Sequence, residues 1–309
     1  MSTPRFSVII PLYNKEAEIE RTLRSVLAQT LAPLEIVIVD DGSTDRSVER
    51  VEAINSPLVK LHRQANAGSA VARNRAIELA EGEYIAMIDA DDEWTPDYLA
   101  EIARLIELYP DCGGWCSGFD IVSEDGTFAG DTPQYEGVVE DYFAEAMKRY
   151  VCITSATTIA RRVFDEVGGF PVGMRMGQDT YMWIKLARNY RVATTPKRLC
   201  RYNRAAQNRT PSIYRGDDGT ASFRDFYTAG REPMLDEYAA RIGLSRAIII
   251  SAKGGTEEAR DTEQFFSYTK LNRRILRKLQ VINRLPVAWR WNALRAYNWL
   301  AWKIARKGL

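Results

Sequence analysis

The sequence YIAMIDADDEW, residues 84–94, decides the fold of this chain. Its first five residues suit a buried strand of a parallel sheet, and the carboxylates of Asp89, Asp91 and Asp92 follow at once. Ligand sites of such sheets lie beyond the carboxyl ends of the strands, and clustered acids repel one another unless a cation lies between them. The stretch therefore predicts a site for a divalent cation and substrate phosphates. An acidic loop that only caps the next helix would show the same pattern.

The composition is that of a globular protein with an uneven distribution of charge. The 309 residues are 46% hydrophobic and 27% charged, enough for one large α/β domain with an appendage or for two domains. Eleven of the 42 Lys and Arg lie from Gln264 onward, where there is no Asp or Glu. The remaining 31 basic residues stand against 41 acidic ones upstream. A basic tail on an acidic body suggests an anionic partner, or a basic helix that covers the body.

Cysteine usage and hydropathy predict a cytoplasmic protein. Of the four cysteines only Cys112 and Cys116 are close together, and His62 is the sole histidine. This is neither a disulfide framework nor a zinc site, so reduced thiols are expected. We expect no signal sequence before the first strand and no membrane span, since no apolar run reaches about 18 residues.

Apolar runs alternate with amphipathic segments along the first half of the chain. The runs 6–12, 35–39 and 58–61 are predicted strands separated by helices, which indicates βαβ units and a nucleotide-binding type of α/β sheet. Further predicted elements are the helices 96–108, 140–150 and 181–189, the strands 113–122, 154–159, 190–194 and 199–202, and the C-terminal helices 221–244, 262–282 and 286–306. The polar segment 204–219 is predicted to be a loop that orders over a ligand.

Polar residues follow three predicted strands on one rim of the sheet: PLYN at 11–14, DDGS at 40–43 and DADD at 89–92. The helix after Gly68 adds Arg73 and Asn74. Carboxylates can accept from a pyrimidine N–H and from ribose hydroxyls, and an arginine offers planar donors beside them. The sequence has neither Gly-x-Gly-x-x-Gly nor Gly-x-x-x-x-Gly-Lys-Ser, which argues against dinucleotide dehydrogenases and P-loop enzymes.

The motifs VIIPLYN, EIVIVDDGSTD, NAGSAVARN and MIDADDEW resemble, in this order, those of the family-two inverting glycosyltransferases of the GT-A fold, of the bacterial surface-polysaccharide type. The likeness is strong over 7–94 and looser through VGGFP and GQDTYMWIKLA to about residue 202. It implies an α/β fold with a Rossmann-like, mostly parallel central sheet flanked by helices. Residues 1–220 would form the catalytic domain, with a nucleotide-binding half 1–95 and an acceptor half 96–220, and 221–309 a helical extension.

The resemblance assigns a nucleotide pocket position by position. Asp40 matches the residue that accepts the nucleobase N–H. Pro11, Tyr13 and Glu18 match the residues that frame the base, and Arg73 matches the arginine of the pocket. It implies a nucleotide-sugar donor, a UDP-sugar, bound at this rim.

The resemblance also assigns the reacting centre. Asp89 would bind the ribose, Asp91 would bind Mg²⁺ or Mn²⁺, and Asp92 would help through water. Asp179 falls where the family has its catalytic base, although it could also serve as an N-cap. The metal would neutralise charge on the leaving phosphate, and the base would take the proton of the acceptor hydroxyl. A single in-line displacement then inverts the anomeric centre.

Two departures from the family pattern keep alternatives open. Gln178 stands where the family usually has Glu, so a catalytically weak or inactive GT-A binding or scaffold protein is one alternative. The family histidine after the strand at 199–202 is missing, which leaves Arg201, Arg204 or Arg209 to steady the diphosphate. A nucleotidylyltransferase is a further alternative, but it would want a Gly-rich basic loop after the first strand, where this chain has Tyr13-Asn14-Lys15-Glu16.

The expected activity is sugar transfer to a glycan or lipid-linked glycan in polysaccharide biosynthesis, with no nucleic acid partner. The tail at 286–309 carries two helical faces: Leu294, Tyr297, Ala301 and Ile304 on one, and Arg295, Trp299, Trp302, Lys303 and Arg306 on its neighbour. Tryptophans beside basic residues suit the headgroup layer of an anionic bilayer, here the inner face of the plasma membrane. Homodimerisation or packing on the catalytic domain fits this pattern equally well.

Overall fold

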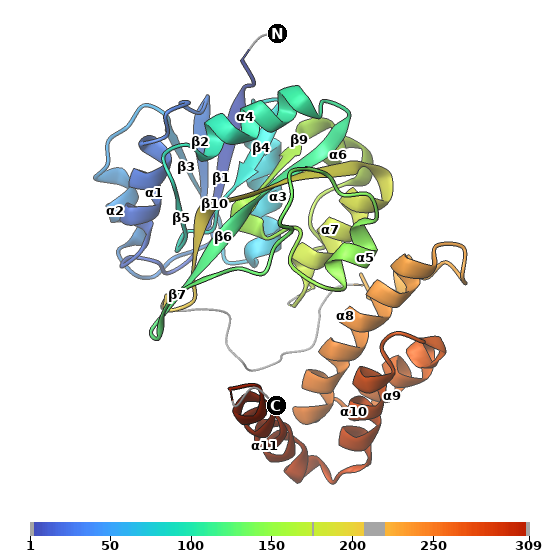
Figure 1. Cartoon of the computed structure of the whole chain (residues 1–309). Coiled ribbons are helices and arrows are strands. Elements are labelled where there is room, and N and C mark those ends of the chain that lie inside the picture. Colours follow the sequence, from blue (N-terminus) through green and yellow to red (C-terminus); the bar gives the residue numbers. More distant parts are fainter. Residues whose placement is uncertain (1–2, 175, 207–219, 307–309) are drawn as a thin grey trace. The chain divides into compact units, whose positions relative to one another are not determined.

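The computed structural model describes residues 3–174, 176–206 and 220–306, the last seven by their backbone alone. It divides the chain into two units, Met1–Thr210 and Pro211–Leu309. The first is an α/β unit built on a mixed sheet, and the second is helical (Figure 1). The boundary expected at 220/221 lies shortly after this division.

Parallel strands form the first half of the sheet, in the order β3 (Val59–Arg63), β2 (Glu35–Asp40), β1 (Phe6–Leu12) and β4 (Tyr84–Met87). Strands β1 and β2 are buried along almost their whole length, which explains their unbroken apolar sequences. Helix α3 (Ser69–Leu79) packs on both of them. Because parallel strands end at one edge, the segments after Leu12, Asp40 and Met87 are brought together there.

Antiparallel pairings enter in the second half of the sheet. Strand β9 (Thr157–Ala160) runs antiparallel to both β4 and β6 (Cys112–Ser123), while β10 (Arg191–Asn203) is parallel to β6. Two short strands were predicted where β10 is a single strand with register shifts near Pro196. Proline cannot donate to the ladder, which is why the sequence there appeared to break. The short strands at the margin are β5 (Glu93–Trp94), β7 (Gly126–Ala129) and β8 (Gly137–Val138).

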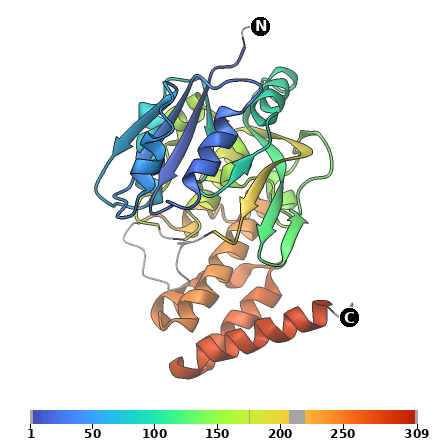
Figure 2. The same ribbon diagram turned by 90° about the vertical axis from the view of Figure 1, so that its left-hand side faces the viewer.

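Helices cover the sheet and connect its strands (Figure 2). The predicted α/β fold with a central sheet flanked by helices is confirmed. The helices of this unit are α1 (Ile19–Leu27), α2 (Ser47–Glu52), α3, α4 (Tyr98–Leu108), α5 (Tyr142–Ala146), α6 (Arg161–Val167) and α7 (Gln178–Asn189), with a short 3₁₀ turn at Thr154–Ala156. Most of the predicted loop at 204–219, including Arg209, lies outside the described residues.

The second unit consists of α8 (Pro233–Ala252), α9 (Thr256–Phe265), α10 (Arg273–Arg284) and α11 (Val287–Arg306), with 3₁₀ turns at Phe223–Phe226 and Phe266–Tyr268. The helix predicted at 262–282 is interrupted because buried Glu237 of α8 accepts backbone N–H groups of Lys270 at 2.7 Å and Leu271 at 3.1 Å. These bonds satisfy amides that precede α10. Within the described ranges, no helix combines the length and hydropathy that crossing a bilayer requires.

Candidate active site

Asp40, the last residue of β2, is fully buried at the carboxyl edge of the sheet. Its Oδ1 accepts the backbone N–H of Ser43 at 3.1 Å. Its Oδ2 has no hydrogen-bond donor among the described residues, and the nearest cation is Nε of the exposed Arg63, 3.6 Å away. A buried carboxylate oxygen without a donor is costly, so this atom is suited to accept an N–H group from a ligand.

Asp41 has a supporting role that the sequence reasoning missed. Its carboxylate accepts from the backbone N–H groups of Ala67 at 2.9 Å and Gly68 at 2.8 Å, and from the Gln64 amide at 2.8 Å. These bonds tie the end of β2 to the loop that opens α3. In the sequence, the role is indicated only by the adjacent acids Asp40 and Asp41 before Gly42. The sequence does not distinguish the acid that faces the ligand from the one that supports the loop.

Arg73 of α3 is buried and lies against the loop that follows β4. Its NH2 group donates to Asp89 Oδ1 at 2.6 Å, and its guanidinium lies over the Phe170 ring, 5.4 Å from the centroid. Burial lowers the pKa of Arg73, but the carboxylates of Asp89, Asp179 and Asp91 outweigh it and leave the pKa raised. Three acidic residues, two from the loop after β4 and one from α7, therefore act on one buried cation.

The two acids after Asp89 have different environments. Asp91 Oδ2 forms an ion pair with Lys15 Nζ at 2.8 Å. Asp92 is fully buried and accepts from the Ser155 hydroxyl at 2.5 Å and the Asn203 backbone N–H at 2.7 Å. Burial, followed by the charges of Asp89 and Asp91, raises the pKa of Asp92 well above its usual range. Asp92 thus connects two segments of the fold, and its burial does not fit the expected action through water.

The acidic loop does not serve as a helix cap. Helix α4 begins after Asp97, whose side chain makes no capping hydrogen bond, and the three acids of the loop contact Arg73, Lys15 and Ser155 instead. The alternative reading of this stretch as a cap for the next helix is therefore wrong.

The residues present are compatible with a hard divalent cation. Mg²⁺ is commonly held by one or two carboxylates together with substrate phosphates, and Asp91 offers such a carboxylate. No group of three or more His, Cys, Asp or Glu side chains is arranged for a metal in the part of the chain that is described. Lys15 also belongs to the candidate site, because its ammonium group is paired with Asp91. When a cation binds, this ammonium group would have to shift or share the Asp91 carboxylate with it.

Asp179 lies in the first turn of α7, close enough to Arg73 to influence its pKa. The N-cap of this helix is Gly177, whose φ of 83° is in the left-handed region, so Asp179 is not the N-cap. Its Oδ1 accepts the N–H of Thr180 at 2.8 Å. Gln178 donates to the Ser69 hydroxyl at 2.6 Å, which fixes the start of α7 against the start of α3.

A second contact fixes α3 to the turn before α7. The Asn74 amide donates to Phe170 O at 2.9 Å and accepts from Phe170 N at 2.7 Å. Gly169 makes this approach possible, since a Cβ there would lie 2.3 Å from Asn74 Oδ1. Helix α3 therefore positions Arg73 and, through Ser69 and Asn74, the segment that carries Asp179.

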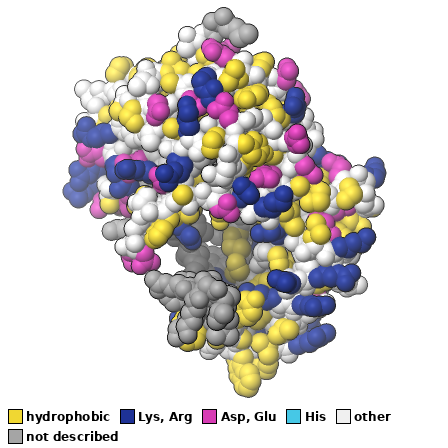
Figure 3. All heavy atoms as spheres, viewed as in Figure 1, with side chains coloured by type: hydrophobic (Ala, Val, Ile, Leu, Met, Phe, Trp, Pro, Cys, Tyr) yellow, Lys and Arg dark blue, Asp and Glu magenta, His cyan; other side chains and the backbone are white. Residues whose placement is uncertain are grey.

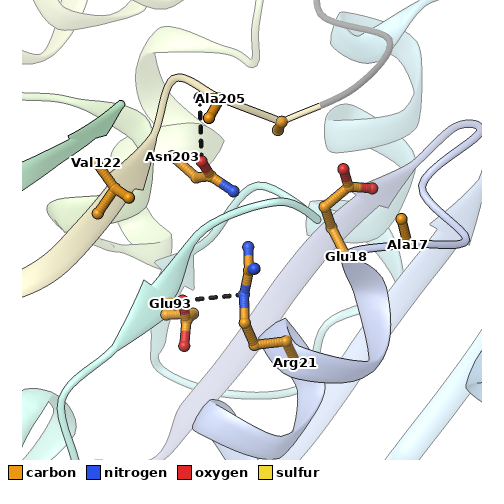
Figure 4. Close-up of a pocket in the computed structure, with 8 residues that line it drawn as sticks. Ala17, Glu18, Arg21, Glu93, Val122, Asn203 and Ala205 are labelled. Carbon is orange, nitrogen blue, oxygen red and sulfur yellow. Dashed lines mark hydrogen bonds and ion pairs between the residues drawn. The ribbon is translucent and has the colours of Figure 1, made fainter. Parts of the chain in front are cut away.

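A cavity of about 400 Å³ opens beside this edge, between α1, β5 and the end of β10 (Figure 4). Glu18 lines it, together with Arg21 and Asn203, and Arg21 Nε forms an ion pair with Glu93 at 2.9 Å. The ring of Tyr13 is exposed. The structure thus places Glu18 beside this cavity, and the roles of Pro11, Tyr13 and Glu18 around a base remain predictions.

Comparison with known proteins identifies the family. The family model described as glycosyl transferase family 2 matches residues 7–168, more than half of the chain. The chain belongs to glycosyl transferase family 2. The matched segment contains Asp40, Arg73, Asp89 and Asp91 and the parallel strands β1, β2 and β4.

Two curated relatives named as glycosyltransferases match less than half of the chain. The uncharacterized glycosyltransferase YibD of Escherichia coli is 54% identical over 97 residues, 31% of this chain and 28% of its own length. The putative teichuronic acid biosynthesis glycosyltransferase TuaG of Bacillus subtilis is 38% identical over 127 residues, 40% of this chain and 50% of its own length. The chain thus spans at most half the length of these two relatives.

Solved structures of glycosyltransferases share the fold. Staphylococcus aureus TarS 1-349 in complex with UDP-GlcNAc superposes with a TM-score of 0.59 at 22% identity, covering 87% of this chain and 74% of that one. The mannosyltransferase PcManGT from Pyrobaculum calidifontis, in complex with GDP-Man and Mn²⁺, gives 0.52 at 20% identity, covering 97% and 81%. At such identities the likeness supports the GT-A fold alone, which agrees with the fold expected from the sequence.

Proposed function

We propose that this protein is a metal-dependent, inverting glycosyltransferase that moves a sugar from a nucleotide diphosphate donor, a UDP-sugar, to a glycan or lipid-linked glycan acceptor. The observation that carries the proposal is that Asp89, Asp91 and Asp179 act on the buried Arg73, while Asp40 ends the neighbouring parallel strand β2. Membership of glycosyl transferase family 2 supports the reaction class.

The donor would bind along the carboxyl edge. Asp40 Oδ2 would accept the N–H of a uracil ring, for which this buried oxygen has a free lone pair. Asp89 would hold the ribose, while its ion pair with Arg73 keeps the carboxylate oriented. Lys15 and Arg73, which are paired with Asp91 and Asp89, would place positive charge near the diphosphate. The nucleotide-bound neighbours TarS, with UDP-GlcNAc, and PcManGT, with GDP-Man, support a nucleotide-sugar donor.

Transfer would proceed as a single displacement. Asp179 would take the proton of the acceptor hydroxyl while the hydroxyl oxygen forms its bond to the anomeric carbon. The bond from that carbon to the diphosphate oxygen breaks on the opposite face, and the nucleoside diphosphate leaves with the bonding electrons. When bound at Asp91, Mg²⁺ or Mn²⁺ would act as a Lewis acid for this leaving group.

The names of relatives support a polysaccharide product. They include the putative teichuronic acid transferase TuaG, the putative colanic acid transferase WcaA of Escherichia coli and the chondroitin synthase of Pasteurella multocida. All three names refer to polysaccharide biosynthesis. We therefore propose a growing glycan or its lipid-linked precursor as the acceptor class, with the protein working in the cytoplasm.

The test combines donor binding with turnover. A panel of UDP-, GDP-, ADP- and dTDP-sugars, with and without Mn²⁺, is screened for thermal stabilisation, and a donor that binds is then offered glycan acceptors. We expect a UDP-sugar to stabilise the protein most, with Mn²⁺ required. Asp179→Asn should retain donor binding and lower transfer by at least about a hundredfold. The exposed Asp125→Asn is the matched control.

Each rival function has its own outcome in this test. Binding without transfer by the wild type, and unchanged by Asp179→Asn, would favour a scaffold protein. Release of pyrophosphate from a nucleoside triphosphate and a sugar phosphate would identify a nucleotidylyltransferase. A product that retains the donor's anomeric configuration would contradict the single displacement.

A further inference from the structure

Helix α10 of the C-terminal unit carries a basic face. Its buried residues Leu276, Leu279 and Ile282 lie on one side of the helix. The other side exposes Arg273, Arg274, Arg277 and Arg284. None of these four arginines forms an ion pair with another described residue. Figure 3 shows Lys and Arg side chains gathered over this unit at the lower right of the view.

Helix α11 carries an aromatic face. Leu294 and Arg290 are buried against the other helices, whereas 67% of Trp289 and 56% of Trp299 remain exposed. At 100° per residue these two tryptophans lie on the side opposite Leu294. Both views of the ribbon place α11 at the margin of the helical unit (Figures 1 and 2). Large exposed aromatic side chains beside exposed cations mark an interaction surface rather than ordinary solvent-facing helix.

The two helices that carry these faces contact each other. Lys278 Nζ of α10 lies 4.0 Å from the centroid of the Tyr297 ring and 3.2 Å from Asn298 Oδ1, both on α11. Arg274 and Val281 lie one helical turn to either side of Lys278, on the exposed side of α10. We define the basic–aromatic surface by six exposed residues, Arg274, Arg277 and Val281 of α10 and Trp289, Arg295 and Trp299 of α11.

A buried arginine fixes the orientation of α11 without neutralising this charge. Arg290 NH1 donates to Thr256 Oγ1 at 2.8 Å, its NH2 to Asn283 O at 2.9 Å and its Nε to Leu285 O at 2.9 Å. All these acceptors are neutral. The helix is therefore held in one register against its neighbours, and the tryptophans are presented on a fixed scaffold.

The charge of the segment selects the class of partner. From Gln264 to the C-terminus there are eleven Lys and Arg and no Asp or Glu. A second copy docking by this face would place the same cations against one another in a two-fold interface, which is unfavourable. Tryptophan side chains prefer the headgroup level of a bilayer, and Lys and Arg are attracted to anionic lipids.

We propose that the basic–aromatic surface docks on an anionic lipid bilayer. The cations of α10 would contact lipid phosphates while Trp289 and Trp299 enter the headgroup layer. The side chains from residue 300 onward, among them Trp302, Lys303 and Arg306, lie outside the described residues and are not needed for this assignment. The proposal concerns a surface of the helical unit and stands independently of the enzymatic function.

The test is flotation of the full-length chain with vesicles. One set contains phosphatidylcholine alone and the other adds about 30% phosphatidylglycerol, whose charge attracts basic residues. We expect flotation with the anionic vesicles alone, and loss of most of it at about 0.5 M NaCl, where surface charges are screened. Trp289→Ser should lower the partition coefficient about tenfold by removing a buried aromatic contact. Arg277→Glu should lower it about tenfold or more through charge reversal.

Matched controls separate docking from folding and from general charge. Arg50→Glu makes the same change in net charge on α2, and Phe128→Ser removes a similarly exposed aromatic residue from β7, so both should float like the wild type. Circular dichroism confirms that each variant is folded. Equal flotation of all variants would overturn the proposal. So would a dimeric mass by light scattering that Trp289→Ser makes monomeric, or binding to duplex DNA, abolished by Arg277→Glu, without vesicle binding.

Discussion

Replacing Asp40 by Asn tests whether its unpaired buried oxygen recognises a nucleobase. In the free protein, Asp40 Oδ2 faces no described hydrogen-bond donor and lies 3.6 Å from Arg63, whose side chain is 65% exposed. An ion pair with such an exposed arginine contributes about 0–1 kcal/mol. An uncharged amide is cheaper to bury than a carboxylate. The Asn variant should therefore unfold within about 1 kcal/mol of the wild type.

The effect on uracil nucleotides should be much larger. A carboxylate that accepts the ring N–H makes a charge-assisted hydrogen bond of about 1.5–3 kcal/mol, and an amide nitrogen in its place would oppose one donor to another. Since about 1.4 kcal/mol corresponds to a factor of ten, the dissociation constant for UDP should rise between about tenfold and about a hundredfold. Isothermal titration calorimetry measures the change directly, with Asp125→Asn as the control variant.

UDP methylated at ring nitrogen 3 makes the test specific to one hydrogen bond. The methylated ligand cannot donate that proton, so it should bind the wild type about as weakly as UDP binds the Asn variant. The Asn variant should bind UDP and the methylated ligand with similar affinity. If methylation weakened binding to the variant as much as to the wild type, the assigned contact would be wrong, and Asp40 would act through the fold rather than through the base.

Three further predictions concern the scaffold of the α/β unit. Asp41→Ala should speed amide hydrogen exchange at Ala67 and Gly68 by about tenfold, because each N–H loses an acceptor worth about 1–2 kcal/mol. Unchanged exchange at these two residues would contradict the assigned hydrogen bonds. Gly169→Ala should destabilise the first unit by about 1–3 kcal/mol, since its Cβ would meet Asn74 Oδ1, and the double variant with Asn74→Ala should lose less than the sum of the two changes. Glu35→Gln should lose about 1–2 kcal/mol at pH 7. Burial raises the pKa of Glu35, but its ion pair with Lys60 Nζ at 2.7 Å and hydrogen bonds from Ser7 and the Glu81 N–H together leave it below its usual value. The wild type's advantage is therefore complete above about pH 4.5 and shrinks as the pH falls through the lowered pKa, which urea titrations at several pH values can follow. An advantage that grows on acidification would contradict the assigned ion pair.

The first half of the fold could be predicted because its information is local. Strands β1 and β2 are buried on both faces, so nearly every residue is apolar and the run is visible in one reading. The loops that follow them carry the acids of the site, and parallel strands bring those loops to one edge. The antiparallel insertion of β9 and the bulged course of β10 depend on pairings between distant residues, and local sequence patterns do not encode them.

The assignment of roles within the DADD loop shows where sequence reasoning stops. Asp91 and Asp92 are identical in type and adjacent, yet Lys15, 76 positions away, contacts the first, while Ser155 and Asn203 bury the second. Each partner arrives through the packing of a different element. The difference between a candidate metal ligand and a structural acid is therefore a property of tertiary contacts.

Helix α3 explains how the two halves of the site are kept in register. Arg73 on its inner face holds Asp89, while Ser69 and Asn74 fix Gln178 and Phe170, which flank Asp179 in the chain. A glutamine serves the contact with Ser69 as well as a glutamate could, because the amide donates directly to the hydroxyl oxygen. We therefore expect a glutamine at residue 178 to hold Asp179 in place as well as a glutamate would. Gln178→Ala should consequently impair transfer, because Asp179 is no longer held in position. Gln178→Glu keeps an acceptor for the Ser69 hydroxyl and should retain most of the activity. If Gln178→Ala left the rate of transfer unchanged, the contact between α3 and α7 would not position Asp179, the proposed base.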